Sequence, residues 1–116
     1  MFPRIYIIIL QYNRSQDTIK CLDSVRELNY PNYQIVVADN ASESSEKNNI
    51  REYIKSQSRL HGHLVNLQDA HVTRLENEKN LGYAGGKNVG IKYALEHGAD
   101  YVFVLNNDTT VESDLI

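Results

Sequence analysis

The sequence has 116 residues, of which 41% are hydrophobic and 23% charged, and these proportions fit a single globular domain with a modest core. The net charge of −3 provides no basic surface for nucleic acid or anionic lipid. The only cysteine, Cys21, excludes an internal disulfide and a cysteine-based zinc site, and it favours a reducing compartment, the cytoplasm.

The first half of the sequence predicts two strands and the beginning of an alternating pattern. The apolar run 5–10 is typical of a strand buried on both faces, and it is too short for a signal peptide or a membrane span. Ser15 can cap a helix that should end before Pro31. Residues 34–38 form a second apolar run, which ends at Asp39.

The middle of the chain predicts a helix and a short strand. The helix should cover residues 46–59, because its apolar residues recur at helical spacing. The segment 60–71 has no clear period. Residues 72–76 then form a short third strand.

The last part of the sequence predicts one more helix and one more strand. Gly85 and Gly86 should open the helix, and Gly98 lies where a left-handed C-terminal cap is expected. The run 101–105 is a fourth, fully apolar strand. The helix residues expected to face inward are Ile91, Ala94 and Leu95.

Alternating strands and helices predict a three-layer α/β/α domain with a mostly parallel sheet, spanning residues 1–116. The fourth strand is as hydrophobic as the first, so we expect both to be central in the sheet. No element that would cover the far side of the fourth strand is evident, which indicates a fold that is cut short. An exposed sheet edge of this kind favours a homodimer.

Polar residues follow each predicted strand at the point where it ends. The carboxyl ends of parallel strands meet at one edge of a sheet, where ligands of open α/β sheets bind, so we expect these side chains to gather there. They are Tyr12 and Asn13, Asp39 and Asn40, Glu76 and Asn77, and Asn106 and Asp108. The alternative is that asparagine and aspartate only form turns, which suits one residue better than it suits all of them.

Two segments at this edge have a chemical interpretation. Asp108, beside the amide oxygens of Asn106 and Asn107, suits Mg²⁺ or Mn²⁺ that is completed by ligand phosphates and water. Alternatively, Asp108 caps the next turn. The glycine-rich segment 82–86 can direct helix N–H groups at an anion, or it can be a flexible entry to the helix. Lys87, which follows it, is interpreted as solvated rather than phosphate-binding.

Four segments in order resemble glycosyltransferase family 2, in particular its rhamnosyltransferase-like members. They are 7–13 (IIILQYN), 35–42 (IVVADNAS), 80–90 (NLGYAGGKNVG) and 105–109 (LNNDT), the last a variant of the family's DXD motif. Each motif is modest alone, but the ordered set is specific. The resemblance implies the Rossmann-like GT-A fold and the N-terminal, nucleotide-sugar-binding portion of a larger catalytic domain.

The resemblance also implies roles for single residues. Tyr12 lies where such enzymes pack against the nucleobase, and Asp39 lies where a carboxylate accepts a hydrogen bond from the base. Asp108 is implied to hold the Mg²⁺ or Mn²⁺ that binds the diphosphate. Asn106 replaces the first aspartate of the motif, so it can bond a ribose hydroxyl but adds no charge to the metal site. The other implied donor-binding residues are Asn13, Asn40, Asn80, Gly82, Gly85, Gly86 and Asn88.

The activity that the resemblance implies is inverting transfer of a sugar from a dTDP- or UDP-sugar to a glycan or lipid-linked acceptor, in polysaccharide biosynthesis. Relatives often act at the cytoplasmic face of the membrane, so we expect peripheral membrane association. The family's acceptor-binding half and its catalytic base lie beyond the DXD motif. The 116 residues are therefore expected to bind a donor without completing turnover.

Two other classes of protein share parts of this pattern. A non-catalytic nucleotide-binding or scaffold domain with the same fold is the main alternative. A flavodoxin-like or receiver domain also alternates strands and helices, but in such a domain the segments 82–88 and 106–108 would have no function.

Overall fold

The computed structural model describes residues 2–61 and 72–116, and within them the strands form one four-stranded sheet in the order β3-β2-β1-β4. All paired strands are parallel. Residues 62–71, most of the segment without a predicted period, lie outside the described residues. The elements are β1 (Ile5–Gln11), α1 (Ser15–Arg26), β2 (Tyr33–Asp39), α2 (Ser44–His61), β3 (Val72–Glu76), α3 (Gly82–Glu96) and β4 (Tyr101–Asn106).

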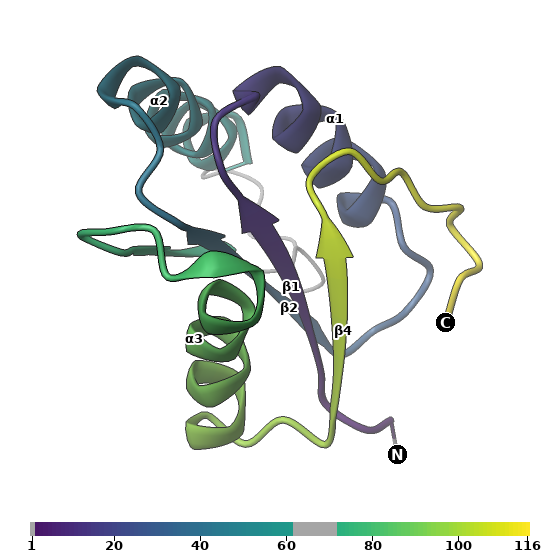
Figure 1. The fold of residues 1–116 in the computed structure, drawn as a ribbon. Helices are drawn as coiled ribbons and strands as arrows, with labels where there is room; N and C mark the ends of the chain where they lie inside the picture. Colours follow the sequence, from purple (N-terminus) through teal and green to yellow (C-terminus); the bar gives the residue numbers. More distant parts are fainter. Residues whose placement is uncertain (1, 62–71) are drawn as a thin grey trace.

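Helices cover both faces of the sheet (Figure 1). On one face, α1 and α2 pack over a core that includes Ile7, Ile9 and Leu22. On the other face, α3 packs over a smaller core that includes Ile8 and Ala94. Successive side chains of a strand point to opposite faces, so β1 is apolar on both faces from Ile5 to Leu10 and shows no alternation before Gln11. The predicted three-layer α/β/α architecture with a parallel sheet is confirmed.

Glycines let α3 approach the sheet closely. A Cβ atom on Gly90 would stand 2.5 Å from Cγ2 of Ile8, and one on Gly86 would stand 2.9 Å from Cδ1 of Leu10. Such distances are well inside van der Waals contact, so a side chain at either position would push the helix off the sheet. Part of the glycine-rich sequence therefore serves helix packing.

The expectation that β4 is a central strand is wrong. The inner strands are β1 and β2, whereas β4 pairs only with β1 among the described residues. Its side chains remain partly accessible: Tyr101 is 61% exposed and Phe103 is 39% exposed. Hydrophobicity reports that a strand is suited to burial, but it does not report whether both of its edges are paired.

The segment that follows β4 folds back along α1 (Figure 1). The Val111 N–H donates to Oγ of Ser24 at 3.1 Å, and the Asn29 N–H donates to the carbonyl of Ser113 at 2.7 Å. These bonds hold the chain after β4 against the C-terminal part of α1.

The prediction that Ser15 caps α1 with its side chain is wrong. Arg14 occupies the cap position with a left-handed backbone, φ 48°, and makes no side-chain cap bond. Instead, Oε2 of Glu46 accepts the Ser15 N–H at 2.8 Å, so a carboxylate from α2 satisfies the free donor. Hydrogen bonds from the Ser15 side chain and backbone hold the pKa of Glu46 below its usual range.

The remaining differences concern helix ends and one helix face. The third helix begins at Gly82, three residues earlier than predicted, because a positive φ of 76° at that glycine turns the chain into the helix. Leu95 is 63% exposed, so its predicted inward orientation is wrong. Gly98 has the predicted left-handed conformation, φ 85°, and Cys21 is buried as predicted. Among the described residues, no helix combines the length and apolarity needed to cross a bilayer.

Candidate functional site

The parallel register brings the predicted polar residues to one edge of the sheet. Gln11 at the end of β1 is the Cα partner of Asp39, and Asp39 in turn is the partner of Glu76 at the end of β3. Asn106 at the end of β4 is the partner of Leu10. The residues that follow all the strands therefore share the carboxyl edge of the sheet, the edge at which open α/β sheets bind ligands.

Asp39 is the most unusual residue of this edge. Its side chain is 5% exposed, and its Oδ2 accepts the Ser42 N–H at 3.1 Å. Its Oδ1 is buried and has no hydrogen-bond partner within the described part of the chain. A small pocket of about 10 Å³ lies beside Asp39, lined also by Lys47, Arg74 and other residues of β2, α2 and β3. An unsatisfied buried carboxylate oxygen is costly, so Oδ1 is available to accept a hydrogen bond from a ligand or from water.

Glu76, in contrast, is fully engaged by cations. Arg51 of α2 donates from Nε to its Oε2 at 2.8 Å, and Arg74 donates from Nη1 to the same oxygen at 3.0 Å. The hydrogen bond from Arg51 is the main reason that the pKa of Glu76 lies below its usual value. Glu76 therefore fastens α2 to β3 and is not left free for a ligand.

Asn13 ties together the loops that follow β1, β2 and β4. Its backbone is left-handed, φ 51°, and its N–H donates to Oγ of Ser42 at 2.7 Å. Its Oδ1 accepts the Glu43 N–H at 2.9 Å, and its carbonyl accepts Nδ2 of Asn107 at 3.5 Å. The side chain of Asn13 thus shapes the edge of the site from within the protein.

Asn40 does the same on the side of α3. Its Nδ2 donates to Oδ1 of Asn80 and to the carbonyl of Gly82, both at 3.0 Å. Its Oδ1 accepts the Leu81 N–H at 2.9 Å and Nδ2 of Asn77 at 3.3 Å. All four bonds of this buried amide hold the loop that leads into α3, so Asn40 and Asn80 position that loop.

Other predicted residues present exposed atoms at the same edge. Tyr12 is 49% exposed, and Asn88, Asn106 and Asp108 are also exposed. At the start of α3 the Leu81 side chain makes no cap bond, and the Gly82 N–H donates to Oδ1 of Asn80 at 2.7 Å. Of the predicted glycines, Gly82 is exposed, Gly85 approaches the Leu81 side chain, and Gly86 packs against Asn40. Lys87 is half-buried, with Nζ 5.2 Å from the centre of the Tyr83 ring.

The side chains at this edge could supply only some of the ligands of a metal ion. Within residues 2–61 and 72–116 no group of three or more His, Cys, Asp or Glu side chains is placed to enclose a cation. Asp108 is exposed and follows the exposed Asn106 by two positions. One carboxylate suits a divalent ion that takes its other ligands from phosphates and water.

A buried polar group that the sequence reasoning missed lies beneath this edge. Gln11 is fully buried, and its Nε2 donates to the Asn13 carbonyl at 2.8 Å and to Oγ of Ser42 at 3.4 Å. Its Oε1 accepts the hydroxyl of Thr18 in α1. The one signal in the sequence is a glutamine directly after an uninterrupted apolar run.

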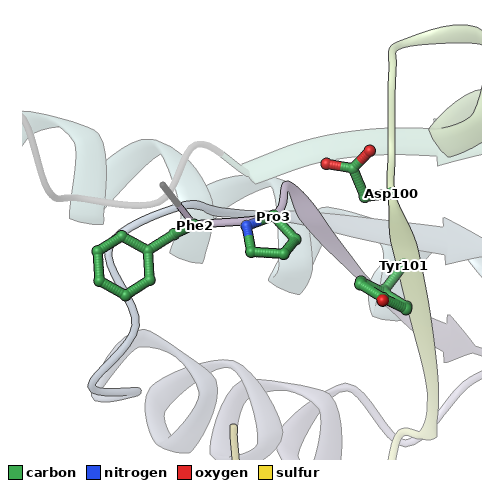
Figure 2. A pocket seen from close by; sticks show the side chains of 4 residues that line it. All are labelled: Phe2, Pro3, Asp100 and Tyr101. Atoms are coloured by element: carbon green, nitrogen blue, oxygen red, sulfur yellow. The ribbon is translucent and has the colours of Figure 1, made fainter.

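A larger cavity lies at the opposite edge of the sheet. Figure 2 shows Phe2, Pro3, Asp100 and Tyr101, which line a space of about 490 Å³. These residues precede or begin β1 and β4, at the amino ends of the strands. The cavity includes none of the predicted site residues.

The comparisons with known proteins agree on the class of protein. The model of glycosyl transferase family 2 matches residues 6–116. The dTDP-rhamnosyl transferase RfbF of Shigella flexneri is 28% identical over all of this chain, and the amylovoran biosynthesis glycosyltransferase AmsB of Erwinia amylovora is 31% identical over 93% of it. The chain spans about a third of the length of either relative, 33% and 32% respectively.

Two solved structures show the same fold. The mannosyltransferase PcManGT from Pyrobaculum calidifontis, in complex with GDP-Man and Mn²⁺, superposes with a TM-score of 0.75 at 22% identity, over 95% of this chain and 29% of that one. Residues 1–349 of TarS from S. aureus, in complex with UDP, superpose with a TM-score of 0.69 at 18% identity, over 96% of this chain and 29% of that one. The predicted GT-A fold is therefore confirmed.

Proposed function

The chain belongs to glycosyl transferase family 2, and on this premise we propose that it forms the donor-binding part of an inverting glycosyltransferase that uses a dTDP- or UDP-linked sugar. RfbF is named as a dTDP-rhamnosyl transferase, and the TarS structure contains UDP. Because dTDP and UDP are both pyrimidine nucleotides, they support a pyrimidine nucleotide as the carrier of the sugar. The GDP-Man of PcManGT supports only the broader proposal that the donor is a nucleotide sugar.

The observation that carries the proposal is the unpaired Oδ1 of Asp39. Most buried carboxylate oxygens are hydrogen-bonded, so an unpaired one at the ligand edge of a parallel sheet indicates a missing donor. The ring N–H of uracil or thymine is such a donor. In this proposal Asp39 accepts that hydrogen bond, and the exposed ring of Tyr12 packs on the base.

The remaining proposed contacts of the donor involve its ribose, its diphosphate and a metal ion. Asn106 bonds a ribose hydroxyl, and the loop that Asn40 and Asn80 hold brings the first turn of α3 towards the diphosphate. Asp108 holds a divalent metal, Mg²⁺ or Mn²⁺, and the Mn²⁺ of PcManGT supports this assignment. A divalent metal held there would supply positive charge to neutralise the departing nucleoside diphosphate.

Donor binding is the part of the reaction that we assign to these residues. The chain covers about a third of RfbF and of AmsB, 33% and 32%. We assign the acceptor site and the catalytic base to the remaining two thirds of such proteins. The acceptor in this proposal is a glycan or a lipid-linked saccharide at the cytoplasmic face of the membrane, where peripheral association would bring enzyme and acceptor together.

The experiment that tests the proposal compares two aspartates at opposite edges of the sheet. Asp39→Ala should weaken binding of UDP or dTDP by about 1–3 kcal/mol, because a hydrogen bond to a buried charge is lost. Asp100→Ala is the matched control, since Asp100 bonds the Arg4 N–H at the amino edge of the sheet. Equal nucleotide affinity of the Asp39→Ala variant and the parent protein, measured by calorimetry, would remove Asp39 from the site.

A further inference from the structure

Gln11 is a buried polar residue that the proposed donor contacts do not use. It ends β1, is fully buried, and uses both N–H groups of its amide and its carbonyl oxygen within the protein. The acceptors are the Asn13 carbonyl and Oγ of Ser42, and the donor is the hydroxyl of Thr18 in α1. A fully satisfied amide at this depth fixes the relative positions of the groups that it bonds.

The bonds of Gln11 lead to Asp39 through one further residue. Nε2 of Gln11 donates to the hydroxyl oxygen of Ser42, and the backbone N–H of Ser42 donates to Oδ2 of Asp39. The hydroxyl of Ser42 also accepts the Asn13 N–H at 2.7 Å. A continuous series of hydrogen bonds thus runs from Thr18 on α1, through Gln11 and Ser42, to the carboxylate of Asp39.

The turn that carries Ser42 needs such an anchor. Ala41, directly before it, has a left-handed backbone with φ 66°, a conformation that is unfavourable for alanine. A strained conformation persists only where its surroundings hold it. The contacts of the Ser42 hydroxyl with Gln11 and Asn13 provide that hold, and Asp39 is oriented by the same turn.

We propose that Gln11 is a positioning residue for donor binding: through Ser42 it sets the orientation of the Asp39 carboxylate and thereby aims the unpaired Oδ1 at the nucleobase. This inference rests on the proposed function of the site. Gln11 itself touches no part of the donor. The alternative is that Gln11 only fills the core and satisfies its neighbours, without influence on Asp39.

A double-mutant cycle distinguishes these roles in the protein that carries this chain. Gln11→Met keeps the length of the side chain but removes its hydrogen bonds. It should weaken UDP binding roughly threefold to tenfold when Asp39 is present, but less than about twofold in the Asp39→Ala background. Ser24→Ala is the matched control, because it also removes a hydroxyl bond on α1 but lies beside Val111, remote from this series.

A second readout does not require a nucleotide. Gln11→Met should accelerate hydrogen exchange of the Ser42 amide by about tenfold or more, because its bond to Asp39 opens locally. The amide of Val36, in the centre of β2, should keep its exchange rate after correction for the change in global stability. This comparison separates a local effect on the turn from general destabilisation.

The outcomes are separable. If the parent protein binds UDP and the effects of Gln11→Met and Asp39→Ala simply add, the positioning role is wrong while the proposed function stands. If the parent binds no nucleotide, the proposed function is wrong, and the positioning of a donor carboxylate is overturned with it. If the Ser42 amide exchanges no faster in Gln11→Met, Gln11 does not hold the turn, whatever the nucleotide result.

Discussion

Asn40→Ala offers a direct test of how the site is held together. The substitution removes the four hydrogen bonds that the Asn40 side chain makes with the loop before α3. Two of the partners, the Leu81 N–H and the Gly82 carbonyl, are backbone groups that cannot turn away. Leu81 and Gly82 are exposed, so water can replace part of what is lost, and at a net contribution of about 0.5–1.5 kcal/mol for each bond we expect a total loss of about 2–4 kcal/mol.

The assay is urea denaturation followed by circular dichroism, with Asn88→Ala as the matched control. Asn88 is an exposed asparagine in α3, where alanine is the better helix former, so its substitution should change stability by less than about 0.5 kcal/mol. A midpoint for Asn40→Ala that equals the midpoint for Asn88→Ala would refute the reasoning. It would mean that the loop before α3 is held by other contacts.

Three further predictions concern packing, pH and thiol chemistry. Gly90→Ala should lower stability by about 1–3 kcal/mol, because the new Cβ would stand 2.5 Å from Cγ2 of Ile8; in a urea denaturation cycle with Ile8→Ala the two losses should sum to more than the loss in the double variant, and simple additivity would contradict the close contact. Since the pair with Arg51 lowers the folded-state pKa of Glu76, the pair contributes stability above the ordinary glutamate pKa of 4.5 and loses it as pH falls through the lowered value. Glu76→Gln should therefore flatten the fall in urea midpoint between about pH 6 and about pH 3, and an unchanged fall would contradict the pairing. Burial raises the pKa of the Cys21 thiol to about 11, so a thiol reagent at neutral pH should react only as the protein unfolds; rapid labelling of the folded chain would contradict the burial.

The elements that the sequence predicted well are those whose pattern depends on local chemistry. The continuous apolar runs in β1 and β2 require burial on both faces, and such burial occurs in parallel sheets covered by helices. Parallel strands in turn place their ends at one edge, which is how the position of Asp39 could be predicted before its environment was known.

The elements that the sequence did not predict depend on partners far away in the chain. The edge position of β4 depends on which strands pair with it, and hydrophobicity does not encode this. The cap of α1 comes from Glu46, a residue of the next helix, so the local motif at Ser15 was misleading. The role of Gln11 depends on Ser42, which lies far along the chain. Long-range hydrogen bonds leave no periodic pattern in a sequence.

Calorimetric titration of the chain with dTDP-rhamnose and with UDP-glucose, each with and without Mn²⁺, tests the central claim most directly. The account predicts that at least one of the two donors binds, that its affinity increases with Mn²⁺, and that Asp108→Asn abolishes the increase. Absence of binding by both donors, in this chain and in a longer form that includes the rest of the protein, would contradict the claim that this edge of the sheet is a donor site.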